Sequence, residues 1–182
     1  MISRKYLHIL STQTTKVSTP LYVRLKFNGG ITMSKQHLLW LENCLKEVHK
    51  KTNLESFIGL EIVEVAEGKI VYRAKISDKH CNIYGFVHGG ILSSIADIAM
   101  GISCMTLGKR VVTIDMSISY IKNVTQGSII TAVGEVIGNG RTIMRATGEI
   151  LDERQQLLVK SQASYYVTGS FRKDDFPGLM PG

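Results

Sequence analysis

The chain has 182 residues, of which 44% are hydrophobic and 20% are charged, which suits one globular domain with a sizeable core and a short extension. Its longest apolar stretch begins at Gly89 and is interrupted by serines and by Asp97. No run therefore approaches the ~20 apolar residues of a membrane-spanning helix, and we expect neither a transmembrane segment nor a membrane partner.

The formal net charge of +7 raises the question of nucleic-acid binding. The first 32 residues carry five Lys or Arg residues and no acid, which leaves +7 − 5 = +2 for residues 33–182. Because the basic charge belongs mainly to this leader, nucleic acid is not an expected partner.

The cysteines and histidines do not form a recognisable metal or disulfide pattern. Cys44, Cys81 and Cys104 are odd in number and far apart, so they fit neither a disulfide framework nor a paired zinc spacing. We expect reduced thiols and a cytoplasmic location. The histidines lack ligand spacing such as H-E-x-x-H, and we expect no metal and no cofactor.

Residues 1–32 are basic and rich in Ser and Thr, and three interpretations of this leader stay open. It is a disordered extension, or it is an organellar transit peptide, in which case the protein works in the mitochondrial matrix. Alternatively, the natural start is Met33, because Gly29-Gly30 can be encoded by GGAGGN, a bacterial ribosome-binding sequence, followed by a two-residue spacer.

The rest of the chain divides into three parts. Residues 33–56 contain an amphipathic helix, for which Ser34 is a suitable N-cap and in which apolar residues recur at helical spacing to about Lys51. Residues 57–169 form the main domain. Residues 170–182 are short, polar and contain Pro and Gly, which predicts a flexible tail.

The main domain begins with two strands around a turn at Glu67-Gly68, and the second strand alternates as a half-buried strand does. A loop and a long apolar helix from about Gly89 to Leu107 follow. Turn signals then separate four strand-like segments: RVVTIDMSISYI from Arg110, SIITAVGEVIG from Ser128, RTIMRATGEILD from Arg141 and LLVKSQASYYV from Leu157.

This order of elements predicts the fold. Consecutive strands joined by short turns make an antiparallel sheet, against which the one long helix must bury its apolar surface. Because the helix is apolar nearly all round, we expect the sheet to wrap it. The expected class is α+β, a hotdog fold with an antiparallel β-sheet around one central α-helix.

Polar residues gather at the start of this helix. His88 and Gly89-Gly90 open it, and Asp97 stands alone in its apolar middle. A helix N-terminus offers unpaired N–H groups and a partial positive charge, and glycine lets a ligand approach closely. These features suit the negative oxygen that forms when a carbonyl group is attacked. A buried lone carboxylate costs free energy unless it is paired, protonated or used.

Three sequence features together resemble a known family. The run N-x-x-G-x-x-H-G-G, the acid nine residues after its histidine and the later T-I-D-M at 113–116 resemble hotdog acyl-CoA thioesterases of the phenylacetate-pathway type. That group includes the mammalian thioesterase-superfamily members, and the resemblance covers about residues 57–169. It implies hydrolysis of an acyl-CoA thioester to a free acid and CoA.

The resemblance also implies roles for individual residues. Asp97 would be the general base or nucleophile, and the Gly89 N–H would bind the thioester carbonyl, with Gly90 beside the substrate. Asn82 and His88 would position the reacting groups. Thr113 stands where the family often has a hydroxyl that helps to hold the attacking water.

The spacing of Gly89 and Asp97 predicts a shared site. Eight residues along one helix correspond to about 12 Å, too far for one carboxylate to reach a carbonyl held at its own helix start. If both residues act on one thioester, Asp97 must come from a second copy whose helix runs antiparallel across a two-fold axis. We therefore expect a homodimer, and the resemblance adds a dimer of dimers.

Simpler roles stay open for these residues. Asp97 would be a structural acid if it bonded to Ser93, Ser94 or a partner chain. His88 would be a satisfied loop histidine, and Asn82 a turn residue. For the whole protein, the alternative is a non-catalytic acyl-CoA-binding hotdog module, against which the retained acid argues.

The binding surface for the rest of the substrate is less defined by the sequence. Arg141 follows an Asn-Gly pair typical of hairpin turns, and its guanidinium also suits a CoA phosphate, with Lys122 a weaker candidate. An apolar acyl site is indicated by four residues: Tyr84, Phe86, Met100 and Met105.

Overall fold

The computed structural model describes residues 33–51 and 54–172 of the chain. The leader, residues 1–32, lies outside the described residues, and its three interpretations stay open. None of the described helices is long and apolar enough to cross a membrane.

Helix α1 spans Lys35–Lys51, and a short helix α2, not predicted from the sequence, spans Leu54–Ile58. Ser34 caps α1 as expected, since its Oγ accepts a hydrogen bond of 3.2 Å from the His37 N–H. The fully buried residues of α1 share one face and are Leu41, Cys44 and Leu45. The boundary predicted between residues 56 and 57 falls inside α2.

A six-stranded antiparallel sheet forms the body of the domain, in the order β1-β2-β4-β5-β6-β3. All six predicted strands are confirmed: β1 Glu61–Ala66, β2 Lys69–Lys75, β3 Lys109–Tyr120, β4 Ile129–Asn139, β5 Ile143–Leu151 and β6 Leu157–Ser170. Strands β1 and β3 are the two edges of the sheet.

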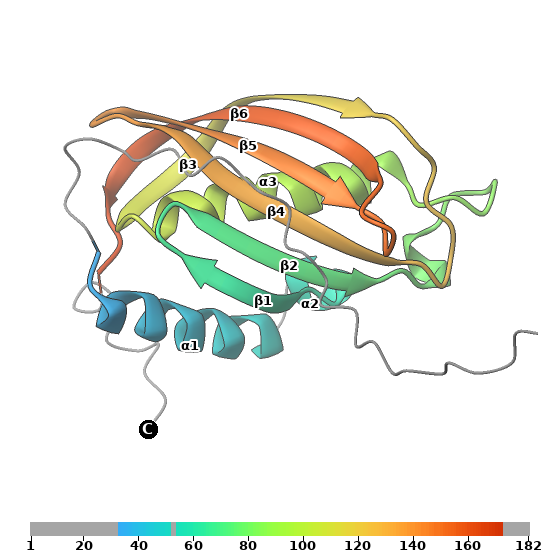
Figure 1. Cartoon of the computed structure of the whole chain (residues 1–182), viewed down its shortest axis with the longest axis horizontal. Helices are drawn as coiled ribbons and strands as arrows, with labels where there is room; N and C mark the ends of the chain where they lie inside the picture. Colours follow the sequence, from blue (N-terminus) through green and yellow to red (C-terminus); the bar gives the residue numbers. More distant parts are fainter. Residues whose placement is uncertain (1–32, 52–53, 173–182) are drawn as a thin grey trace, which may run out of the picture.

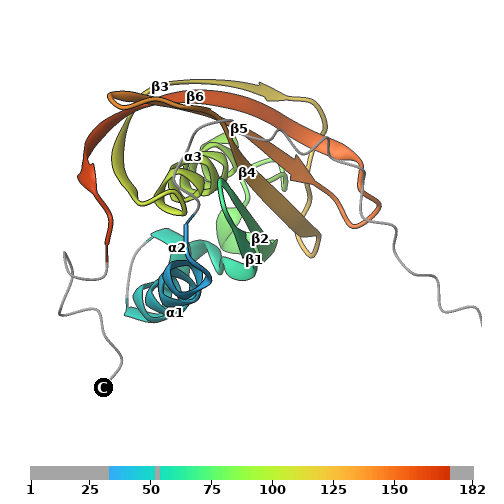
Figure 2. The same cartoon turned by 60° about the vertical axis from the view of Figure 1, so that its left-hand side comes forward.

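Helix α3, Gly89–Met105, lies in the hollow of the curved sheet, as expected for a hotdog fold (Figure 1). Its buried face consists of Leu92, Ile95, Ala96, Ala99, Met100, Ser103 and Cys104. Gly134 on β4 permits this close packing, because a Cβ there would lie 2.1 Å from the Ala99 carbonyl oxygen. Figure 2 shows the sheet arching over α3, with α1 on the side that the sheet leaves open.

Burial of α3 is incomplete within one chain. The face that carries Ile91, Asp97, Ile98 and Ile102 is only half-buried. The sheet therefore wraps one side of this apolar helix rather than all of it, and the side away from the sheet is only half-buried.

The C-terminal boundary differs from the prediction. Strand β6 runs through Ser170, and Phe171 is buried, with its ring centroid 5.5 Å from that of Trp40. The sequence therefore places the start of the tail too early, at residue 170. The structured part extends further because the Phe171 ring packs against Trp40 and anchors the end of β6 to α1. Residues 173–182 lie outside the described residues.

Candidate active site

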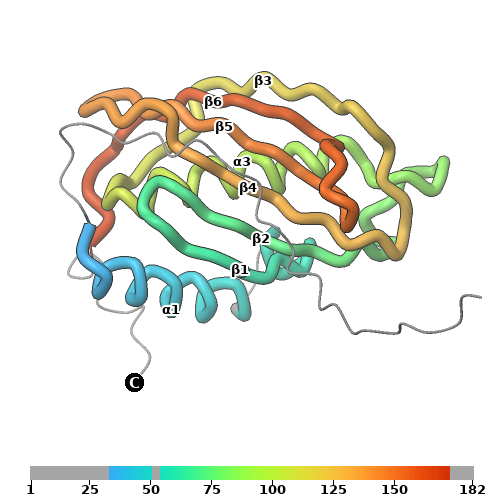
Figure 3. The backbone as a smooth tube through the Cα atoms, in the orientation of Figure 1, coloured from blue at the N-terminus to red at the C-terminus, as the bar shows by residue number. Residues whose placement is uncertain are grey.

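A short loop of residues 81–88 leads into α3 at one end of the molecule (Figure 3). Asn82 organises this loop, because its Oδ1 accepts hydrogen bonds from the N–H groups of Tyr84 at 2.9 Å and Phe86 at 3.3 Å. Its side-chain NH₂ donates to no described residue. The turn role and the predicted substrate role are compatible, since they use different atoms of the same side chain.

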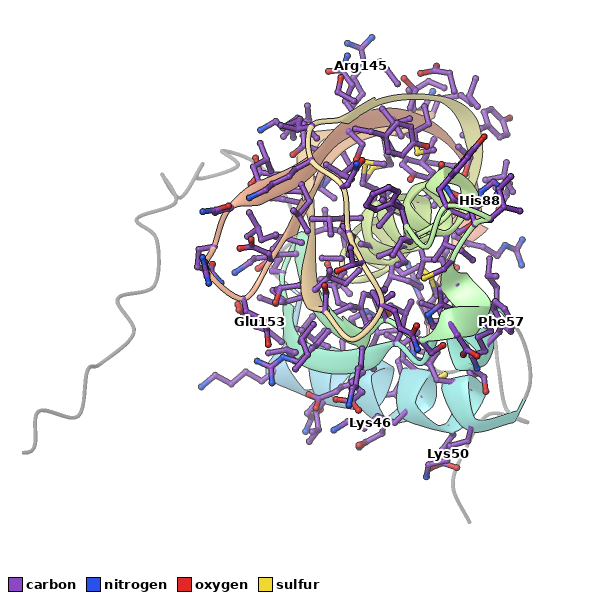
Figure 4. All side chains as sticks on the ribbon, turned by 90° about the vertical axis from the view of Figure 1, so that its right-hand side faces the viewer. Lys46, Lys50, Phe57, His88, Arg145 and Glu153 are labelled. Carbon is purple, nitrogen blue, oxygen red and sulfur yellow. The ribbon has the colours of Figure 1, made fainter. Side chains whose placement is uncertain are left out.

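His88 is the N-cap of α3, and its Nδ1 accepts a hydrogen bond of 3.1 Å from the Gly90 N–H. That nitrogen therefore supplies a lone pair, and the neutral ring carries its proton on Nε2. The His88 backbone N–H donates to the His80 carbonyl at 2.8 Å. Figure 4 views the molecule from this end and places His88 beside the start of the helix.

The two glycines differ in what their N–H groups do. The Gly90 N–H is engaged by His88, whereas the Gly89 N–H has no acceptor among the described residues. The Gly89 carbonyl accepts hydrogen bonds from Ser93 Oγ at 2.8 Å and from the Tyr120 hydroxyl at 3.1 Å. The turn is thus held from several sides, with one N–H group left to bind a ligand.

Asp97 is half-buried in the middle of α3. Its Oδ1 accepts hydrogen bonds from Thr113 Oγ1 at 2.9 Å and from the Tyr165 hydroxyl at 3.0 Å. No described residue donates to Oδ2. Ser93 and Ser94 do not bond to this carboxylate, because each hydroxyl donates 2.8 Å to the carbonyl four residues before it. The structure therefore does not show the purely structural role of Asp97 that hydrogen bonds to Ser93 or Ser94 would have given it.

Thr113 and Tyr165 reach Asp97 from neighbouring strands. They are direct partners in the antiparallel ladder of β3 and β6, so their side chains lie on the same face. The ladder shifts register between Thr113 and Asp115, and Asp115 pairs with Ser164 on the opposite face. The predicted hydroxyl thus donates to the carboxylate, and it retains only acceptor capacity towards a water.

Tyr165 was not predicted as a site residue. Its position in an alternating strand marks it only as a core aromatic, and nothing in its spacing connects it with Asp97. Burial raises the pKa of the Tyr165 hydroxyl, and the adjacent Asp97 carboxylate raises this pKa further. The hydroxyl is therefore protonated at neutral pH and acts as a permanent hydrogen-bond donor.

The predicted substrate-binding residues lie further away. Arg141, exposed in the turn between β4 and β5, lines a groove with Leu107 and Lys109 beside the C-terminal end of α3. This is the end of the helix opposite to Gly89. Lys122 is engaged by Gln156 Oε1.

Of the four residues expected at an acyl site, Tyr84 and Phe86 are exposed in the loop before α3, and Met105 is half-buried. Met100 is fully buried against the sheet. The expectation for Met100 is therefore wrong within one chain, because its side chain fills the core. Among the described residues, no three metal-ligating side chains lie close enough to hold an ion.

Comparison with known proteins fits this geometry. The family model "Thioesterase superfamily" matches residues 84–159, which contain Asp97, Thr113 and the glycine turn. A hypothetical thioesterase of Streptococcus pneumoniae TIGR4, solved with coenzyme A, is 30% identical to this chain, with a TM-score of 0.60. The matched region covers 61% of this chain and 90% of that protein. The chain belongs to the thioesterase superfamily.

Two further known proteins are similar to this chain. Human acyl-coenzyme A thioesterase 13 is 28% identical over 122 residues, which are 61% of this chain and 87% of that protein. The PaaI protein of the Escherichia coli phenylacetic acid degradation operon, at 20% identity and a TM-score of 0.68, covers 74% of this chain and 97% of its own and shares the fold. The expected hotdog fold, thioesterase family and enzyme class, a thioester hydrolase, are confirmed.

The S. pneumoniae protein offers one more point of agreement. It was also solved with alanine in place of an aspartate and, separately, of a threonine, and these two positions are sixteen residues apart in that chain. Asp97 and Thr113 are sixteen residues apart here and hydrogen-bonded to each other. That relative therefore contains an aspartate and a threonine with the same spacing as the pair that is hydrogen-bonded here.

Proposed function

We propose that the protein hydrolyses an acyl-CoA thioester to the free acid and CoA, with Asp97 as its general base or nucleophile. The observation that carries this proposal is the state of the Asp97 carboxylate. Two hydroxyl groups hold Oδ1, while Oδ2 receives no hydrogen bond from a described residue. A carboxylate fixed through one oxygen keeps the other available to take a proton from water or to attack a carbonyl carbon.

The Gly89 N–H is the proposed oxyanion donor. It lies at the first position of α3, where the helix dipole favours negative charge, and no described residue occupies it. The His88–Gly90 hydrogen bond and the contacts to the Gly89 carbonyl fix the direction of this N–H before a substrate binds. His88 Nε2–H and the Asn82 NH₂ remain as donors that orient the substrate.

We further propose that each site is shared between two copies of the chain. Gly89 and Asp97 lie on one helix, eight residues or about 12 Å apart. The half-buried face of α3 supports pairing with a second helix that runs antiparallel, which would place the Asp97 of one copy near the Gly89 of the other. Such pairing would also bring the C-terminal end of α3, beside which Arg141 lies in the β4–β5 turn, to the side of the partner's glycine turn. The Arg141 guanidinium would there meet a CoA phosphate.

Free-thiol release from a panel of acyl-CoA thioesters tests the proposal. We expect the full chain to release CoA and Asp97→Asn to lose a hundredfold or more in kcat, in line with removal of a general base. Asp115→Asn is the matched control, because it removes an acid of the same kind on the other face of β3 and should leave kcat unchanged. Circular dichroism establishes that both variants fold.

Two outcomes would overturn parts of this proposal. An Asp97→Asn variant as active as the wild type would exclude Asp97 from the chemistry. A wild type that binds a non-hydrolysable acyl-CoA thioether in calorimetry, but releases no thiol from any member of the panel, would instead indicate a non-catalytic acyl-CoA-binding module.

A further inference from the structure

We propose that Tyr165 is a positioning residue of the active site, which holds Asp97 Oδ1 so that Oδ2 faces the reacting groups. The inference rests on the proposed catalytic function of Asp97. The Tyr165 hydroxyl lies 3.0 Å from Asp97 Oδ1 and 3.1 Å from the Asp97 carbonyl oxygen. Both acceptors belong to the same residue, so this hydroxyl fixes the side chain of Asp97 relative to its own backbone.

A packing role alone does not account for the hydroxyl at this position. Tyr165 is 1% exposed, and a phenylalanine ring would fill the same space. A comparison is available in Tyr72, which is also fully buried and whose hydroxyl has no hydrogen-bond partner among the described residues. Two tyrosines are thus buried within residues 33–51 and 54–172, and of these two Tyr165 directs its hydroxyl at the carboxylate.

The two donors to Oδ1 make the carboxylate asymmetric. Thr113 approaches from the exposed edge strand β3, and Tyr165 approaches from the buried side on β6. An oxygen that already accepts two hydrogen bonds has less free electron density than one that accepts none. Oδ2 is therefore the more basic oxygen, and Tyr165 contributes to this difference from a place that the substrate does not reach.

Few titratable groups face this pair. Tyr165 comes from β6, Cys104 lies beyond Asp97 on α3, and β3 contributes only the Thr113 hydroxyl, because Asp115 lies on its other face. The residue opposite Tyr165 on β5 is Met144, which does not titrate. Burial raises the pKa of the Cys104 thiol to about 12, so this thiol stays neutral at neutral pH. Hydrogen bonds to a carboxylate favour its charged form.

The test compares Tyr165→Phe with Tyr72→Phe in the full chain, by the pH dependence of kcat/KM. We expect Tyr165→Phe to lower kcat/KM about tenfold and to move the acidic limb of the profile to higher pH, because a donor to the carboxylate is lost. Tyr72→Phe should leave both unchanged, because its hydroxyl bonds to no described residue. A Tyr165→Phe profile with the wild-type acidic limb would overturn the inference, since loss of packing alone does not move that limb.

A second measurement keeps the proposal testable if Tyr165→Phe does not fold. Incorporation of 3-fluorotyrosine at position 165 retains the hydroxyl and the ring but makes the hydroxyl a stronger donor. The acidic limb should then move to lower pH, and an unmoved limb would count against Tyr165. If the proposed catalytic function of Asp97 were wrong, the wild type would be inactive or Asp97→Asn would be fully active. These outcomes differ from an unmoved acidic limb in an active enzyme, so the two proposals are tested separately.

Discussion

The Thr113 hydroxyl donates a hydrogen bond of 2.9 Å to Asp97 Oδ1 and so joins the edge strand β3 to the middle of α3. Thr113→Val keeps the shape of the side chain and removes this donor. Because a hydrogen bond to a charged group contributes about 1.5–3 kcal/mol, we expect kcat/KM to fall tenfold or more. The melting temperature should stay near that of the wild type, since Thr113 is exposed.

Thr113→Ser provides the control for this prediction. Serine retains the hydroxyl on the same strand, and its thiol-release rate should lie within a few fold of the wild type. If Val and Ser lowered kcat/KM equally, the effect would come from the lost methyl group or from packing, and the hydrogen bond to Asp97 would not be its cause.

The separation of Gly89 and Asp97 along α3 makes the shared site testable by complementation. Gly89→Pro removes the N–H at the first helical position, where proline is tolerated, and adds a ring whose Cβ would lie 3.4 Å from the Tyr120 ring. His88 already has ψ 133°, which suits a residue before proline. We expect Gly89→Pro and Asp97→Asn each to be inactive alone and, when co-expressed, to recover about a quarter of the wild-type activity.

The recovery follows from the geometry of a two-fold dimer. In a mixed dimer, one of the two sites combines the intact Asp97 of one chain with the intact Gly89 of the other. Purification through two different tags isolates the mixed dimers, and thiol release measures them. No recovery in such dimers would mean that both residues act within one chain or not on one thioester.

Asn82 uses its side-chain oxygen in the loop and leaves its NH₂ free. Asn82→Asp retains an acceptor for the Tyr84 and Phe86 N–H groups, so the loop should keep its shape while the free donor is lost. We expect kcat/KM to fall about tenfold at an unchanged melting temperature. Asn82→Ala should lose activity and also about 1 kcal/mol of stability, because two loop N–H groups lose their acceptor.

Equal kcat/KM for the wild type and Asn82→Asp would assign Asn82 to the loop alone. Asn43→Asp on the exposed side of α1 is a matched control for the added charge, and its activity should equal that of the wild type.

His49 on α1 predicts a pH dependence of stability. Burial beside Tyr72, whose ring centroid is 5.7 Å away, lowers the pKa of His49, and Glu55 only partly opposes this. The unfolded chain therefore binds the proton more readily than the folded chain. This stability contribution is present above the ordinary histidine pKa of about 6.5 and is lost as pH falls below it.

Urea unfolding between pH 7 and pH 5 measures this effect. The free energy of unfolding should decrease with falling pH, and the decrease should be smaller in His49→Gln. His37 adds to it in the wild type, because burial lowers the pKa of that side chain too. A His49→Gln variant with the wild-type slope would show that His49 does not contribute.

Periodicity was sufficient to predict α1, α3 and the six strands, but not the short helix α2. The alternation of β2, the apolar run of α3 and the turn signals after it depend on residues that are close together in the sequence, so each can be recognised within one element. Chain ends were predicted less well, because Phe171 is held by Trp40 from a different part of the sequence. Composition alone marked that segment as a tail.

The residues of the candidate site also differ in whether neighbours in the sequence or distant residues determine their positions. The sequence by itself determined that His88 and Gly89 open the helix and that Asp97 follows two turns later, because these residues share one element. Only the tertiary structure decided which donors reach Asp97. Tyr165 is 68 residues away, and its place depends on the register of β6 against β3 and on the shift after Thr113. Moving a strand by one residue turns each side chain to the opposite face, so pairing rather than spacing selects the hydroxyl groups that hold the carboxylate.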